Sequence, residues 1–149
     1  MKKFTKMLLL ALVFIGVASS LTACGSTEDK LLGLWNIKGE DYVLFTDIKD
    51  SKNKGWKKCL TNNYHKPKTN YKEALKQGNA QESVYKIDGD TILIRPIYKE
   101  KIDTKFGYNL KGIKIENNEM KPKLKGYFLK HDKYHNAKVV KLADLDKDK

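Results

Sequence analysis

Apolar residues recur at every second position along much of the second half of the chain. From Met120 to Lys125 apolar side chains alternate with lysines, and residues 106–110 and 113–115 alternate with polar neighbours in the same way. A period of two places successive side chains on opposite faces of a strand. We therefore predict strands here, each with an apolar and a polar face, and an Asn117–Asn118 turn before the lysine-rich strand.

The stretch from Val84 to Tyr98 carries the clearest hairpin signal. Two apolar runs, Val84–Ile87 and Thr91–Tyr98, flank Asp88–Gly89, a dipeptide that accepts the positive backbone angles of a tight hairpin turn. Pro96 cannot donate a ladder hydrogen bond, so the second strand should bend or end its pairing there.

Shorter apolar runs predict further strands at both ends of the domain. The domain opens at residues 31–35, and a compact run follows at Tyr42–Phe45. Residues 127–129 extend the lysine-rich strand, and a last strand is expected at residues 138–142. All of these runs have the length and the polar flanks typical of strands.

The segment from Lys49 to Gln81 breaks this pattern because it is polar and rich in Lys and Asn. It contains one predicted helix, Tyr71–Gln77, which Asn70 can cap, with Glu73 placed as in a capping box and Gly78 at its end. Such an insertion usually covers a barrel end or forms a flap.

Seven or eight strands joined by short turns, with one helix, indicate an all-β meander. On so small a chain, the simplest closure is a small antiparallel up-and-down barrel, which leaves no exposed edges. We assign this barrel to residues 31–143 and a charged tail to residues 144–149.

The first 23 residues have the three parts of a secretory leader. Lys2, Lys3 and Lys6 give a cationic start, residues 7–17 form an apolar run, and small residues follow. The run is short for a transmembrane helix, and its flanks fit a signal peptide. The alternative is an uncleaved N-terminal anchor helix.

Leu21-Thr22-Ala23-Cys24 resembles the lipobox of bacterial lipoproteins. This resemblance implies that the leader is removed, that Cys24 carries fatty-acyl chains such as palmitate, and that residues 24–30 form a tether. Two or three acyl chains give stable membrane attachment. The expected location is the cell envelope: the outer membrane of a Gram-negative host, or the outer face of the cell membrane of a Gram-positive one.

Charge and cysteine content limit the partners. The net charge of +12 falls to +9 once the three lysines of the leader are removed, which favours acidic partners such as anionic lipid or cell-wall polymer. A solvated lysine-rich surface is the plainer alternative. Nucleic acid is not expected outside the cell, and lysine rather than arginine dominates. With Cys24 acylated, Cys59 has no partner, and we expect a buried or idle thiol.

Several segments in order look like the small lipocalin-like lipoproteins of bacteria. These are Gly33-Leu34-Trp35, then residues 43–45, 85–94, 113–120 and 127–130. The resemblance implies that Trp35 plugs one end of the barrel. A basic residue packs over this tryptophan in lipocalins, so Lys130, Lys138 or Lys141 would replace the usual arginine.

Residues able to carry chemistry are few. His131 and His135 form a His-x3-His pair, but in a strand-rich region, so no metal site or other cofactor is expected. No acid–base couple, phosphate loop or serine elbow is recognisable, and we expect no enzyme. An enzyme using Cys59 or the histidine pair is the weakest alternative. The best candidate for contact with an anionic surface is the set Lys114, Lys121, Lys123 and Lys125.

Two functions remain open from sequence. The first is a membrane-anchored, non-enzymatic lipoprotein that binds a small apolar ligand or an envelope component. The second is an immunity, exclusion or inhibitor lipoprotein that acts by protein–protein contact. An interior cavity lined by Ile92, Ile94, Phe106 and Tyr108 would favour a carried ligand, and a filled core would favour surface recognition. The sequence does not indicate an oligomeric state.

Overall fold

The computed structural model describes residues 26–39 and 41–146. The chain divides into two compact units, Met1–Lys30 and Leu31–Lys149. The leader and Cys24 lie outside the described residues. Within these residues, no helix is both long and apolar enough to cross a membrane.

The described residues form two short helices and eleven strands. The helices are α2 (Thr27–Leu31) and α3 (Tyr71–Lys76). The strands are β1 (Gly33–Lys38), β2 (Asp41–Lys49), β3 (Lys57–Asn63), β4 (Gln81–Asp88), β5 (Thr91–Tyr98), β6 (Lys101–Ile102), β7 (Phe106–Lys111), β8 (Glu119–Met120), β9 (Lys123–Phe128), β10 (His135–Asn136) and β11 (Val139–Ala143).

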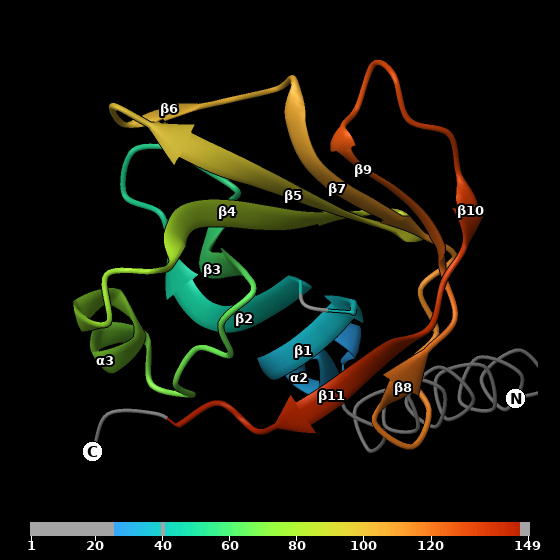
Figure 1. The fold of residues 1–149 in the computed structure, drawn as a ribbon, viewed down its shortest axis with the longest axis horizontal. Coiled ribbons are helices and arrows are strands. Elements are labelled where there is room, and N and C mark those ends of the chain that lie inside the picture. Colours follow the sequence, from blue (N-terminus) through green and yellow to red (C-terminus); the bar gives the residue numbers. More distant parts are fainter. Residues whose placement is uncertain (1–25, 40, 147–149) are drawn as a thin grey trace, which may run out of the picture. The chain divides into compact units, whose positions relative to one another are not determined.

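The strands form one curled antiparallel sheet, a half-barrel, in the unit that begins at Leu31 (Figure 1). Its order is β10-β9-β7-β5-β4-β3-β2-β1-β11-β8, and β6 pairs with β5. The predicted all-β antiparallel architecture is therefore confirmed. The row of partners Gly33, Phe45, Cys59, Ser83 and Pro96 runs from the first residue of β1 to near the end of β5. Strands staggered in this way are tilted, as in curled sheets.

Strands β8 and β9 together form one longer, interrupted strand, and so do β10 and β11. β8 and β9 are separated only by Lys121–Pro122, and β10 and β11 only by Ala137–Lys138. β8 pairs with β11 and β9 pairs with β10. Between these ladders the Ala137 N–H donates to the Pro122 carbonyl at 3.0 Å, so both ladders share one register. The segment β10–β11 therefore contacts β9 at its start and β1 at its end.

The concave side of the sheet holds the main core. Fourteen buried residues from all parts of the sheet contact one another there. Aromatic rings fill much of this interior, and Phe45 and Tyr85 meet edge to face with ring centroids 4.9 Å apart, a favoured aromatic geometry. The core consists of Leu31, Trp35, Ile37, Val43, Phe45, Cys59, Tyr85, Ile92, Ile94, Tyr108, Leu110, Met120, Leu124 and Val139.

A second, smaller core lies on the opposite face of β1, β2 and β3. Leu34, Leu44 and Leu60 alternate with the interior residues of their strands and pack with Ala74 of α3. Tyr71 and Leu75 of the same helix pack against this cluster. Helix α3 therefore covers the outer side of the sheet, whereas the sequence suggested a barrel end or a flap.

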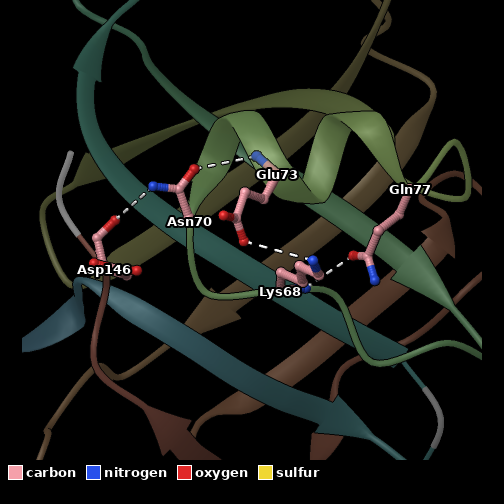
Figure 2. Close-up of polar contacts among 5 residues, drawn as sticks. All are labelled: Lys68, Asn70, Glu73, Gln77 and Asp146. Carbon is pink, nitrogen blue, oxygen red and sulfur yellow. Dashed lines mark hydrogen bonds and ion pairs between the residues drawn. The ribbon is translucent and has the colours of Figure 1, made fainter.

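Helix α3 begins as predicted. The Asn70 side chain accepts a hydrogen bond from the Glu73 N–H at 3.1 Å, and its amide donates to the Asp146 carbonyl at 3.5 Å (Figure 2). The Glu73 carboxylate lies 3.6 Å from Lys68 Nζ, and the Lys68 N–H donates to the Gln77 side chain. The cap thus ties the C-terminal segment to the helix, although Glu73 pairs with Lys68 rather than closing a capping box.

Three elements differ from the sequence prediction. Strand β3 lies within the polar insertion, where we expected only a helix. Residues 113–115 are not a strand, although Ile113 and Ile115 still pack against the core. Helix α2 includes most of the predicted tether. The β4–β5 hairpin and the alternation of buried and lysine positions from Met120 to Lys125 follow the prediction.

Candidate functional site

The outer surface of β7 and β9 carries a cluster that we call the lysine face: Lys111, Lys123, Lys125 and Tyr134. Lys111 and Lys123 are direct cross-strand partners, and Asn109 is the partner of Lys125. Since partners on adjacent strands point to the same side, these residues form one surface opposite the interior residues Tyr108, Leu110 and Leu124.

Tyr134 lies between two of these lysines. Lys111 Nζ is 5.9 Å and Lys125 Nζ is 5.7 Å from the centroid of its ring, within reach of cation–π attraction. The Tyr134 hydroxyl accepts a hydrogen bond from the Asn109 amide at 3.3 Å. The residue is 43 % exposed, so an aromatic surface remains open between two ammonium groups.

Arg95 of the neighbouring strand β5 holds the Asn109 side chain in place. Its guanidinium donates to the Asn109 side-chain oxygen at 2.7 Å and to the Ile94 and Tyr108 carbonyls at 2.8 and 3.0 Å. Burial lowers the pKa of Arg95 from its ordinary value. Because the Asn109 side-chain oxygen accepts the hydrogen bond from Arg95, the Asn109 amide nitrogen faces Tyr134. Asn109 is therefore the donor, and the Tyr134 hydroxyl the acceptor, of the hydrogen bond between them.

A second aromatic–lysine pair lies in the same row of the sheet. Lys86 Nζ is 5.3 Å from the Trp56 ring centroid. The register joins Lys86 to Leu93, Leu93 to Asn109, and Asn109 to Lys125. The two pairs therefore stand at opposite ends of one row across β4, β5, β7 and β9.

The four lysines predicted from sequence differ in their partners. Lys123 and Lys125 belong to the lysine face. Lys114 lies 3.1 Å from Glu116 and Lys121 lies 3.8 Å from Glu119, at a depression of about 470 Å³ in the segment from Gly112 to Lys121. These two lysines are thus paired with carboxylates. Among the described residues no carboxylate lies within ion-pair distance of Lys111, Lys123 or Lys125.

Trp35, the candidate plug, is fully buried in the main core. Its indole N–H donates to the Leu31 carbonyl at 2.7 Å. Of the three lysines considered for the position over the ring, Lys141 is the cross-strand partner of Trp35. A Cβ at Gly33 would lie 2.8 Å from Lys141 Cε, so the lysine stem lies against the glycine of Gly-x-Trp. Lys130 and Lys138 are exposed.

The remaining candidates are Cys59 and the histidine pair. Cys59 is fully buried, and burial raises the pKa of its thiol, which disfavours the nucleophilic thiolate. His131 stacks on Phe128, and His135 is exposed on β10. In the part of the chain that the structure describes, no three His, Cys, Asp or Glu side chains lie where they could hold a metal ion.

Sequence reasoning missed Lys111, Asn109 and Tyr134. For Lys111 and Asn109, the only local signal was their position on the polar, outward face of Phe106–Lys111. Tyr134 lies in a connecting segment, and its contact with β7 has no periodic signature. No family model, curated protein or solved structure matches this chain.

Proposed function

We propose that the chain is an exported, lipid-anchored and non-enzymatic envelope protein that binds an anionic envelope polymer through its lysine face. The observation that carries this proposal is the placement of Tyr134 between Lys111 and Lys125, with no carboxylate at ion-pair distance from these lysines among the described residues. Sugar rings stack on exposed aromatic rings, and lysines attract phosphate or carboxylate groups.

The extent of the surface favours a polymer over a small ion. The row from Lys86 to Lys125 crosses three strand spacings, which is roughly 14 Å at about 4.8 Å per spacing. An aromatic–lysine pair stands at each end of this row. A chain of several sugar or polyol-phosphate units can contact both pairs, and a single headgroup cannot.

The packing of the interior supports surface recognition over a carried ligand. Ile92, Ile94 and Tyr108 are buried in contact with the other core residues, and Phe106 lies apart from that cluster, against Tyr127 and Phe128. We infer a closed, lipocalin-like barrel from the shared register of β8–β9 with β10–β11, with Trp35 and Lys141 at the plug position.

The anchor belongs to the same proposal. Leu21–Cys24 follows an apolar leader, and acyl chains on Cys24 would hold the lysine face near the envelope. Changing Cys24 to Ser should block acylation and release the chain from the membrane fraction, measured by fractionation and by mass spectrometry of the N-terminal peptide. Membrane retention with an unmodified Cys24 would contradict the anchor.

The binding test compares the full chain on polyglycerol phosphate, polygalacturonate and neutral dextran. We expect binding to the two polyanions only. Raising the ionic strength from about 0.01 to 0.15 M should weaken it, since the Debye length falls from about 30 to about 8 Å. Lys111→Gln with Lys125→Gln should reduce affinity about tenfold, corresponding to about 1.4 kcal/mol.

The matched control is Lys114→Gln with Lys121→Gln, which removes the same charge from lysines already paired with glutamates. This control should change affinity less than about twofold. If both double variants lose affinity equally, the loss would come from the lower net charge of the protein and not from the lysine face. Absence of polyanion binding, with retention of an acidic envelope protein that depends on Lys111 and Lys125, would favour the protein–protein alternative.

A further inference from the structure

A group of aromatic side chains lies where β5 and β9 end and β7 begins. We call Tyr98, Phe106, Tyr127, Phe128 and His131 the aromatic tip. Phe106 lies 5.4 Å from Tyr127 and 4.9 Å from Phe128 between ring centroids, and Phe128 stacks on His131 at 4.7 Å. Figure 1 shows these strand ends, with β6, along one margin of the sheet.

The tip exposes large apolar surface. Tyr98 is 53 % exposed, Tyr127 is 45 % exposed and Phe128 is 38 % exposed. Single exposed aromatic residues are common, whereas several in contact mark a surface that binds something. The proposed lysine face does not include these residues. We therefore expect the tip to contact something other than the polymer.

Lysines occur on the two connecting segments that adjoin the tip. Lys99, Lys101 and Lys105 lie between β5 and β7, and Lys130 and Lys133 follow β9; all five are exposed. Within the described residues none of them has a carboxylate at ion-pair distance.

The acids on the same segments are engaged. The Asp103 side chain accepts the Lys105 N–H at 2.9 Å. Asp132 accepts the Gly126 N–H at 2.8 Å, and Glu100 is ion-paired with Lys52. These three acids keep their charge, so with the five lysines the two segments carry a net charge of 5 − 3 = +2.

We propose that the aromatic tip contacts the anionic surface of a lipid bilayer. Tyrosine rings are enriched at the headgroup level of membranes, with an apolar body toward the acyl chains and a hydroxyl in water. Lysines next to such rings are attracted by anionic lipid, roughly fivefold in partition for each lysine. The net positive charge of the two segments complements an anionic bilayer surface, which uncharged lipid does not offer.

The test measures hydrogen exchange of the full chain in phosphatidylcholine vesicles with and without phosphatidylglycerol. Amides in residues 99–105 and 129–133 should exchange at least about threefold more slowly when phosphatidylglycerol is present. Residues 64–68, which carry the 73 % exposed Tyr64, should be unaffected. Since the leader and any acyl chains are the same in both vesicles, attachment alone cannot produce this difference.

Tyr127→Ser with Phe128→Ser should abolish the protection, whereas Tyr64→Ser should leave it unchanged. Because the first variant also removes packing on Phe106, Lys101→Glu with Lys105→Glu tests the same contact through charge alone, with Lys66→Glu as its control. Equal exchange in both vesicles, or protection that survives the charge reversal, would overturn the proposal. So would protection found in native membranes but not in lipid vesicles, which would assign the tip to a protein partner. Changes at Lys111 and Lys125 test the polymer site and should leave this protection intact.

Discussion

At the residue scale, the main core contains polar groups whose hydrogen bonds are satisfied inside. The Trp35 indole donates to the Leu31 carbonyl at 2.7 Å, and the Tyr85 hydroxyl donates to the Thr46 carbonyl at 2.6 Å. A buried donor without a partner costs about 1–3 kcal/mol. These two bonds therefore fix where each large ring can sit as well as contributing stability.

Replacing Trp35 with Phe should lower the free energy of unfolding by about 3 kcal/mol, because the change leaves a void and removes the bond to Leu31. Urea titration of the full chain measures this. Trp56→Phe is the matched control, since Trp56 is only partly buried, and it should cost less than about 1 kcal/mol. An equal loss of unfolding free energy in the two variants would contradict a larger contribution of Trp35 to the core.

Stability should fall as the pH rises above about 9. Burial raises the pKa of Cys59 above 9.0, and burial, with Asp41 3.0 Å away, raises that of Tyr108 above 10.0. Above these ordinary values the unfolded chain releases protons that the folded chain retains, so the slope of unfolding free energy against pH is negative. The contribution of the protonated Cys59 and Tyr108 side chains to the free energy of unfolding is fully present below pH 9.

Urea midpoints measured from about pH 8 to pH 10.5 should therefore decrease. Tyr108→Phe should reduce the decrease above pH 10, although it also removes the hydrogen bond to Asp41. A midpoint that rises with pH over this interval would contradict the burial of both groups.

At the element scale, the cap of α3 offers two neighbouring changes with different expected costs. Asn70→Ala removes a side chain that accepts the Glu73 N–H and donates to Asp146, and should cost about 1 kcal/mol. Lys68→Gln removes an ion pair whose partners are both more than half exposed, and should cost less than about 0.5 kcal/mol. Chemical denaturation compares the two, and the reverse order would refute the role of the cap.

Strands β5 and β7 approach closely at Gly107. A Cβ there would lie 2.0 Å from the Ile94 carbonyl oxygen, and φ is +120°. Gly107→Ala should therefore cost more than about 3 kcal/mol or prevent folding. Gly112→Ala, at φ +79° with nothing within 4 Å, should cost about 1 kcal/mol. Thermal melting separates these outcomes, and similar melting temperatures would exclude a steric role for Gly107.

Elements with a local signal could be predicted from sequence. Asp88–Gly89 located the β4–β5 hairpin, and Asn70 located the start of α3. The alternation from Met120 to Lys125 correctly separated core residues from lysines. In each case the deciding interactions form between residues close in the chain, so the local sequence pattern is enough to predict the element.

Features that depend on distant contacts could not be predicted. Strand β3 has only Cys59 and Leu60 as an apolar signal between lysines and asparagines, and its pairing with β2 and β4 decides its structure. Ile113 and Ile115 alternate like a strand but pack without strand pairing. Within the candidate site, only the fold brings Tyr134 beside Lys111.

At the scale of the whole domain, β11 joins two parts of the sheet, since it pairs with β1 on one side and β8 on the other. Ending the chain after Lys138 removes both ladders and should abolish cooperative unfolding, measured by circular dichroism during urea titration. Ending it after Asp146 removes only residues outside the described part and should leave the transition unchanged. A cooperative transition in the shorter chain would show that these ladders are dispensable.

The pairing of β1 with β11 also sets an order of events during synthesis. Of the strands that the structure describes, β1 leaves the ribosome first and β11 last, so the whole stretch between them must be made before this ladder forms. Contacts of such high sequence separation slow folding. Until β11 arrives, one edge of β1 stays unpaired, and the nascent domain can still be threaded through a narrow pore or captured by a chaperone.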